Sequence, residues 1–241
     1  MDFKGKNVLI TGGSRGIGYA TAAEFVKSGA RVVITGRDEV QLSKAAESIG
    51  AYALKWDIAD ISIREKKLDE AYSLLGGLDV LVNNAGILRT EDYGGILSVT
   101  PESWDQTMAV NLRGTYFLTQ SVLKRWIDSG HKGRVVFVGS NNAYRALDHA
   151  YALSKYAIRG LTTGLGKAMA PYGICVNAVA PGPCTTTILG YEDGEVHKDG
   201  SPYGRHALPI EIAKVIKFLA SEDSGTMVGQ TVIVDGGETL V

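Results

Sequence analysis

The chain has 241 residues, 45% of them hydrophobic, which allows one large buried core. Its 25 Lys and Arg residues balance 26 Asp and Glu residues, so a net charge of −1 excludes a general electrostatic attraction for nucleic acid or an anionic membrane. Because the sequence shows no signal peptide, no apolar run long enough to span a bilayer and no metal-ligand spacing of Cys or His, we expect a cytoplasmic protein without a metal site.

Apolar runs rich in Val and Ile alternate with longer segments of helical periodicity. This alternation predicts an α/β fold: a single doubly wound Rossmann-type domain over residues 1–241, with a seven-stranded parallel sheet flanked by helices on both faces. Residues 185–205 show no sustained periodicity, and we expect them to form a mobile lid. The expected strands are Asn7 to Thr11, Arg31 to Thr35, Ala51 to Trp56, Asp79 to Val82, Arg134 to Gly139, Gly173 to Ala180 and Thr231 to Val234. The expected helices are Gly16 to Ser28, Asp38 to Ser48, Ser62 to Leu75, Pro101 to Asp128, Tyr151 to Ala170 and Pro209 to Ala220.

A glycine-rich segment follows the first expected strand directly: Thr11-Gly12-Gly13-Ser14-Arg15-Gly16-Ile17-Gly18. Glycines at this spacing let the backbone approach a pyrophosphate and lead it to the N-terminus of a helix. A tight turn that only needs small residues is the alternative, but the position between a strand and a helix favours dinucleotide binding.

Tyr151 and Lys155 lie four residues apart on an expected helix, so their side chains share one face. A phenol ionises near pH 10 in water, so acid–base work near neutrality requires a shift of about three units in its pKa. The Lys155 ammonium and an oxidised nicotinamide would supply that shift, and Ser140 would donate a hydrogen bond to the substrate oxygen. The alternative is a packed tyrosine beside a solvated lysine, because Tyr-x-x-x-Lys also occurs by chance.

These motifs resemble the short-chain dehydrogenase/reductase family, in particular its 3-oxoacyl-ACP reductase-like members. The TGxxxGxG fingerprint is complete, and the likeness extends to Asn83-Asn84-Ala85-Gly86, to Asn111, to the Ser140, Tyr151 and Lys155 set, and to Asp235-Gly236-Gly237. The resemblance implies hydride transfer between a nicotinamide and a carbonyl or secondary alcohol. Tyr151 would be the general acid or base, Lys155 would grip the nicotinamide ribose, and Asn111 would hold a water for proton relay. The segment between Ser140 and Tyr151 is about two residues shorter than the family pattern, which makes the position of Ser140 less secure.

The end of the second expected strand indicates which cofactor binds. Gly36 stands where an acidic residue would accept hydrogen bonds from both ribose hydroxyls of NAD. Arg15 and Arg37 would instead converge on a 2′-phosphate, which favours NADP(H), unless both are merely solvated or Asp38 turns inward. Asp57 would help to hold the adenine or would only cap the next turn. The expected cofactor-binding residues are Gly12, Ser14, Arg15, Gly16, Ile17, Gly18, Arg37, Asp57, Ile58, Asn84, Ala85, Gly86, Tyr151, Lys155, Pro181, Gly182, Cys184 and Thr186.

The substrate wall, by resemblance, comes from residues 87–95, residues 141–149 and the lid, and its mixed character identifies no single small-molecule substrate. We expect Arg145 and His149 to be solvated rather than in contact with the substrate. Apolar residues on more than one face of residues 111–128 and 151–170 indicate burial against a second subunit, and the resemblance implies a homotetramer or a homodimer. Two other functions stay open: a non-catalytic NADP(H)-binding sensor, and a nucleotide-sugar epimerase or dehydratase.

Overall fold

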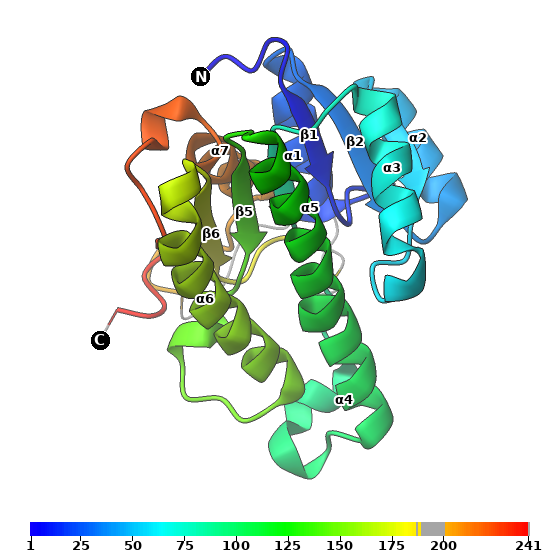
Figure 1. The fold of residues 1–241 in the computed structure, drawn as a ribbon. Coiled ribbons are helices and arrows are strands. Elements are labelled where there is room, and N and C mark those ends of the chain that lie inside the picture. The colour runs from blue at the N-terminus through cyan, green and yellow to red at the C-terminus, as the bar shows by residue number, and fades with distance from the viewer. Residues whose placement is uncertain (187, 189–200, 241) are drawn as a thin grey trace.

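The computed structural model describes residues 1–186, 188 and 201–240. Seven parallel strands form one sheet in the order β3-β2-β1-β4-β5-β6-β7, and helices pack on both of its faces, which confirms the predicted fold class (Figure 1). The strands are β1 (Asn7–Ile10), β2 (Arg31–Gly36), β3 (Tyr52–Lys55), β4 (Val80–Asn83), β5 (Arg134–Val138), β6 (Cys175–Pro181) and β7 (Thr231–Val234). The α-helices are α1 (Gly16–Lys27), α2 (Glu39–Ile49), α3 (Arg64–Leu75), α4 (Pro101–Met108), α5 (Thr115–Ser129), α6 (Ala150–Met169) and α7 (Pro209–Leu219). Shorter helical elements are η1 (Ile61–Ile63), η2 (Thr90–Leu97), η3 (Ala109–Gly114), η4 (Asn141–Tyr144), η5 (Ala170–Tyr172) and η7 (Glu222–Ser224).

The sheet is buried on both faces, which explains why its strands are nearly continuous apolar runs. Successive side chains of a strand point to opposite faces, so Val8 and Ile10 pack with α1, α2 and α7, whereas Leu9 packs with α3, α5 and α6. Figure 1 shows α3, α5 and α6 in front of the sheet, with α1 and α7 behind it. The two apolar cores therefore hold the strands in a register that brings their carboxyl ends to one edge.

The long helix expected over residues 101–128 is divided into α4, the π-helical segment η3 and α5. The wider π turn brings Asn111 to the backbone of Ile87, to which its side chain is hydrogen-bonded. At Gly114 a Cβ atom would lie 2.1 Å from the carbonyl oxygen of Ile58, so a glycine is needed where the helix passes the loop after β3. Sequence periodicity did not predict this interruption because the apolar pattern continues through it.

Two further differences concern the segments beside the expected substrate site. The helical segment η2 was not predicted, because residues 90–97 show no helical repeat. Residues 187 and 189–200, which form most of the expected lid, lie outside the described residues. Within the described part of the chain, the structure contains no helix with the length and apolar character that crossing a membrane requires.

We predict that Trp126→Phe lowers the free energy of unfolding by about 2–4 kcal/mol. The Trp126 side chain is 2% exposed, and its Nε1 donates a hydrogen bond to the carbonyl oxygen of Leu78 at 2.8 Å. A phenyl ring leaves that oxygen unpaired and does not fill the same volume. Urea unfolding followed by circular dichroism measures the change. The matched control is Trp104→Phe at a 40% exposed position, which we expect to cost less than about 1 kcal/mol; an equal loss in both variants would contradict the prediction.

Candidate active site

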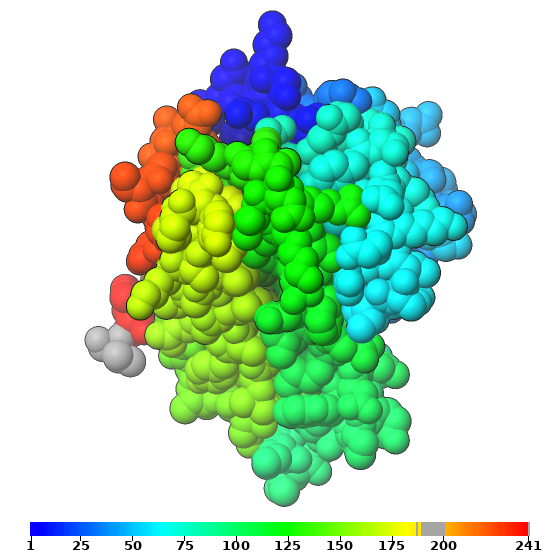
Figure 2. Space-filling view, in the orientation of Figure 1, coloured from blue at the N-terminus to red at the C-terminus, as the bar shows by residue number. Residues whose placement is uncertain are grey.

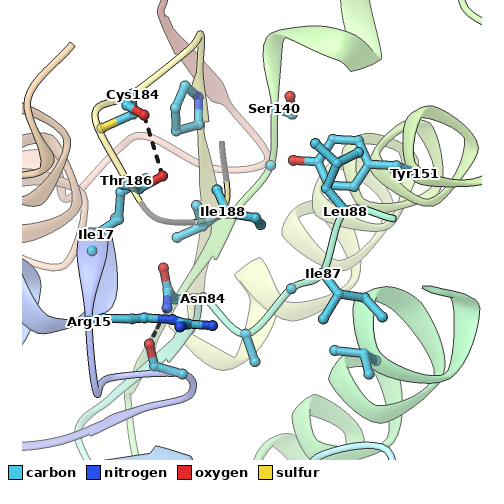
Figure 3. Close-up of a pocket in the computed structure, with 18 of the residues that line it drawn as sticks. Arg15, Ile17, Asn84, Ile87, Leu88, Ser140, Tyr151, Cys184, Thr186 and Ile188 are labelled. Carbon is cyan, nitrogen blue, oxygen red and sulfur yellow. Dashed lines mark hydrogen bonds between the residues drawn. The ribbon is translucent and has the colours of Figure 1, made fainter. Parts of the chain in front are cut away.

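A cavity of about 300 Å³ lies where the carboxyl ends of the strands meet. Its walls are the loops that follow β1, β2, β3, β4, β5 and β6, together with the exposed face of the first turns of α1 and α6. In Figure 3, Arg15 lies at one end of this cavity, and Ser140 and Tyr151 lie at the other. Segments that are far apart in the sequence therefore meet around one elongated space.

The glycine-rich loop forms the floor of this cavity at the start of α1. Gly12 and Gly16 have φ angles of +67° and +56°, a backbone conformation that side chains disfavour. A Cβ atom at Gly12 would lie 3.0 Å from the Cα of Ala85, so the loop is also closely packed against the end of β4. Arg15, the N-cap of α1, makes no side-chain capping hydrogen bond. The positive end of α1 is thus presented to the cavity at Gly16 and Ile17, which fits the pyrophosphate of a dinucleotide.

A small hydrogen-bond network joins the loop after β1 to the loop after β4. The Oγ1 atom of Thr11 accepts hydrogen bonds from the backbone N–H groups of Asn84 and Ala85, each at 3.0 Å. In return, the Nδ2 atom of Asn84 donates to the carbonyl oxygens of Thr11 and Gly12 at 2.9 and 2.8 Å. Asn84, Ala85 and Gly86 therefore line the cavity in a fixed position relative to the glycine loop.

Gly18 differs from the other predicted cofactor-binding residues of this loop, because it does not line the cavity. A Cβ atom at Gly18 would lie 2.2 Å from the carbonyl oxygen of Gly12 and 2.4 Å from the Nδ2 atom of Asn84. Its small size thus allows α1 to pack beneath the loop. Any influence of Gly18 on a cofactor would act through the position of the loop.

The end of the cavity nearest Arg15 has the features that the sequence predicts for a ribose-phosphate site. Arg15, Gly36 and Arg37 line it together with Asp57 and Ile58. Asp57 caps the next turn, because its Oδ1 atom accepts a hydrogen bond from the N–H group of Ala59 at 3.0 Å. It also lines the cavity, so its role towards the adenine stays a prediction.

Asp38, the acidic neighbour of Arg37, does not turn inward. Its carboxylate caps α2 by accepting a hydrogen bond from the N–H group of Gln41 at 3.0 Å. The cavity lining therefore contains the two guanidinium groups without this carboxylate.

At the opposite end, Ser140, Tyr151 and Lys155 all line the cavity. Figure 3 shows the hydroxyl groups of Ser140 and Tyr151 side by side. The Oγ atom of Ser140 accepts a hydrogen bond from the N–H group of Asn142 at 3.1 Å. The Nζ atom of Lys155 donates to the carbonyl oxygen of Val138 at 2.9 Å and lies 5.4 Å from the centroid of the Tyr151 ring. The shorter loop after Ser140 thus still brings the serine to the tyrosine.

Burial dominates the ionisation of this group of side chains. It raises the pKa of Tyr151 to about 12, against the smaller lowering effect of a hydrogen bond with Ser140. It also lowers the pKa of Lys155 to about 8. The chain's own groups therefore do not make the phenol more acidic, because desolvation is the largest influence on its pKa and Ser140 is the group that lowers it. The positive charge of an oxidised nicotinamide would have to supply the opposite shift.

Asn111 lies behind the cavity rather than in its wall. Its Oδ1 atom accepts from the N–H group of Ile87 at 2.8 Å, and its Nδ2 atom donates to the Ile87 carbonyl at 3.0 Å and to the Oγ atom of Ser154 at 3.1 Å. The side chain thus fixes the segment after Gly86. The water-holding role that the resemblance implies for Asn111 stays a prediction.

Pro181, Gly182, Cys184 and Thr186 form the remaining predicted wall, at the end of β6. The Oγ1 atom of Thr186 donates to the carbonyl oxygen of Cys184 at 3.3 Å (Figure 3). Burial raises the pKa of the Cys184 thiol to about 12, so this cysteine stays protonated. A Cβ atom at Gly16 would lie 3.2 Å from the Cγ2 atom of Thr186, which places this segment directly over the glycine loop.

Sequence reasoning missed two buried side chains beside the tyrosine. His149 was expected to be solvated but is only 9% exposed, because it caps α6 and its ring stacks on Tyr151 at a centroid distance of 6.3 Å. Asp92, on η2, is 4% exposed and accepts a hydrogen bond from the N–H group of Tyr151 at 3.1 Å. Neither residue carries a sequence signal for burial, because histidine is not among the residue types that commonly cap helices and the pattern around Asp92 has no periodicity.

Comparison with known proteins gives matches along nearly the whole chain. Residues 12–239 match a family model described as enoyl-(acyl carrier protein) reductase. The 3-oxoacyl-[acyl-carrier-protein] reductase FabG of Aquifex aeolicus (strain VF5) is 34% identical over 98% of this chain and 98% of its own length. The 2,3-dihydro-2,3-dihydroxybenzoate dehydrogenase of Escherichia coli (strain K12) is 36% identical over 100% of this chain and 99% of its own length.

A solved structure is also similar to this chain over nearly its whole length. The 3-ketoacyl-(acyl-carrier-protein) reductase from Brucella melitensis, complexed with NADH, superposes with a TM-score of 0.91 at 31% identity, covering 99% of this chain and 100% of that one. This chain's own structure has the strand order and the glycine loop described above. Its cavity is lined by Ser140, Tyr151 and Lys155 together. With whole-length relatives above 30% identity, the chain belongs to the short-chain dehydrogenase/reductase family of oxidoreductases.

Proposed function

We propose that residues 1–241 form one NADP(H)-dependent oxidoreductase domain that transfers a hydride between the nicotinamide and a carbonyl or secondary alcohol. One observation carries this proposal: Ser140, Tyr151 and Lys155 line the same cavity as the uncapped, glycine-rich start of α1. A sensor that only binds the cofactor would need the glycine-rich start of α1, but it has no use for the Ser140, Tyr151 and Lys155 cluster.

Different residues along the cavity bind the cofactor, orient the substrate and transfer the proton. Bound NADPH supplies the hydride that reduces the carbonyl carbon. In reduction, Tyr151 gives its phenolic proton to the substrate oxygen, and in oxidation its phenolate takes that proton back. Ser140 donates a hydrogen bond to the same oxygen and stabilises the charge that develops there. Lys155 holds a positive charge near the phenol and the cofactor ribose, and the backbone N–H groups at Gly16 and Ile17 bind the pyrophosphate.

The preference for NADP(H) is supported by the other end of the cavity. Arg15 and Arg37 offer charge-assisted hydrogen bonds to a 2′-phosphate, and Gly36 presents no carboxylate to repel it. Asp38 is held in the cap of α2, which removes the expected competitor. A relative was solved in complex with NADH, which lacks the 2′-phosphate. Discrimination between NADPH and NADH in this chain would therefore come from Arg15, Gly36 and Arg37.

We also propose that the protein is cytoplasmic and forms a homodimer or homotetramer. Tyr116 and Leu153 are 42% and 39% exposed on α5 and α6, the two helices whose apolar outer faces indicate a subunit interface. A monomeric mass in solution at micromolar concentration would exclude this assembly.

A carbonyl panel with NADPH tests the function as a whole, beginning with small 3-oxoacyl thioesters and keto sugars. We expect the loss of NADPH absorbance to match the substrate consumed. An epimerase would convert substrate without a net change in that absorbance, and a sensor would bind NADPH without turnover.

In this assay, we predict that Tyr151→Phe lowers kcat by about 100-fold or more, because the proton donor is lost while the shape of the side chain is kept. The Kd for NADPH, measured by cofactor fluorescence, should remain close to that of the wild type. The control is Tyr172→Phe, the same chemical change at a 50% exposed position. Near-normal turnover in Tyr151→Phe would assign the acid to another residue.

We predict that Arg37→Ala lowers kcat/KM for NADPH by about 10- to 100-fold, the loss expected for one or two charge-assisted hydrogen bonds. Activity with NADH serves as the internal control and should change little, because NADH has no 2′-phosphate. Gly36→Asp should shift the preference further towards NADH, and space exists for the side chain, since a Cβ atom there would lie 3.4 Å from the Cδ1 atom of Leu42. Equal losses with both cofactors would contradict a phosphate contact.

The pH dependence of cofactor capture should report Lys155. Burial lowers its pKa to about 8, so the ammonium charge is present below that pH and is lost above it. We therefore predict that kcat/KM for NADPH, which reflects groups of the free enzyme, falls as the pH rises through about 8. A profile that stays flat to about pH 10, the range of an unperturbed lysine, would contradict this role.

A further inference from the structure

Two segments project together beyond the sheet and form the wall next to Tyr151. They are η2 with α4, and the loop from residue 141 to the start of α6; Figures 1 and 2 show them packed side by side. Two carboxylates connect them. Asp148 accepts a hydrogen bond from the N–H group of Ile96 at 3.4 Å, and Asp92 accepts one from the N–H group of Tyr151 at 3.1 Å.

Asp92 is the more deeply buried of the two carboxylates, with a side chain that is 2% exposed. Its Oδ1 atom receives the Tyr151 N–H group, and its Oδ2 atom receives the N–H group of Arg89 at 3.1 Å. Neither Asp92 nor His149 lines the cavity, so neither is placed to touch a substrate. Any effect of Asp92 on the reaction must therefore pass through Tyr151.

The charge of Asp92 has little local compensation. Among the described residues, the one cationic candidate within ion-pair distance is His149, whose Nδ1 atom lies 3.5 Å from Asp92 Oδ1. That Nδ1 atom accepts a hydrogen bond from the N–H group of Ala152 at 3.3 Å. The same ring nitrogen therefore lies close to both the Ala152 N–H group and the carboxylate. Backbone N–H groups and the positive end of α6 also stabilise the carboxylate.

Several polar groups surround Tyr151. Lys155 of α6 lies over its ring, His149 at the cap of α6 stacks on that ring, and Ser140 at the end of β5 lies beside its hydroxyl. From η2, Asp92 accepts the backbone N–H group of Tyr151, and both Asp92 and Tyr93 oppose ionisation of the phenol electrostatically. Asp92 is the carboxylate of this group. We propose, building on the function proposed above, that Asp92 is a positioning residue whose buried carboxylate holds the first turn of α6 and places a negative charge beside the catalytic tyrosine.

The charge opposes the loss of the phenolic proton. A carboxylate near a phenol disfavours the phenolate, and Asp92 accordingly contributes to the raised pKa of Tyr151, after burial. Asp92 thus extends towards higher pH the range in which Tyr151 keeps the proton that carbonyl reduction requires. The same side chain, through its hydrogen bond, fixes where that proton is delivered.

Asp92→Asn removes the charge and keeps an oxygen that accepts the Tyr151 N–H group, while its amide nitrogen loses the hydrogen bond from the Arg89 N–H group. The readout is the ultraviolet difference titration of tyrosinate in the NADP⁺ complex, with the matching Tyr151→Phe protein subtracted. We expect the titration midpoint of Tyr151 to fall by roughly half a pH unit or more. Asp148→Asn is the matched control: it removes an exposed carboxylate that joins the same two segments, and its midpoint should equal that of the wild type.

Asp92→Glu tests the opposite change, because it keeps the negative charge and lengthens the side chain by one methylene group. Its midpoint should stay near the wild-type value, and a fall as large as that in Asp92→Asn would show that geometry rather than charge is responsible, which overturns the proposal. An unchanged midpoint in Asp92→Asn overturns it as well. Should Asp92→Asn fail to fold, Asp92→Ser removes the same charge and keeps a hydroxyl acceptor. Fluorescence titration with NADPH comes first, because absence of cofactor binding by the wild type would refute the proposed function and not the role of Asp92.

Discussion

The hydroxyl of Thr11 accepts hydrogen bonds from the N–H groups of Asn84 and Ala85, and this joint between the ends of β1 and β4 holds the two halves of the cavity together. The joint exists because β1 pairs with β2 on one side and with β4 on the other, so the chain changes its winding direction at this point of the sheet. With the joint in place, Gly12 has to approach Ala85 closely, and the start of α1 is directed into the space between the loops. The cavity end at Arg15 and the end at Ser140 and Tyr151, proposed above to bind phosphate and to react, share this support.

Much of this arrangement could be predicted from the sequence because it depends on local rules. Buried parallel strands require apolar runs, such as the one that begins at Val8, and a phosphate-binding turn requires glycines between a strand and a helix. The four-residue spacing of Tyr151 and Lys155 places both side chains on one face of α6, and the structure brings both to the cavity. Ser140 also reaches it, in spite of the shortened loop that follows.

The features that could not be predicted depend on contacts between distant segments. Asn111 turns to Ile87 because a π turn interrupts the helix, and the apolar repeat gives no sign of that interruption. Asp92 is polar and lies in a segment without periodicity, yet the packing of η2 against α6 buries it. The ionisation of Tyr151 follows the same logic: the nearby Lys155 charge is visible in the sequence, whereas the stronger effect of burial depends on the whole surrounding fold.

The joint between Thr11 and Asn84 also has a consequence for the order in which the protein assembles. The two residues are separated by 73 positions, and the strands that carry them are parallel, so their contact closes a long loop and cannot arise from a local hairpin. Topologies dominated by such distant pairings fold slowly, and here the dinucleotide pocket becomes complete only after β1 and β4 have met. A nascent chain that has not yet exposed residue 84 outside the ribosome therefore lacks half of the proposed phosphate-binding site, and nucleotide capture would mark a late folding event.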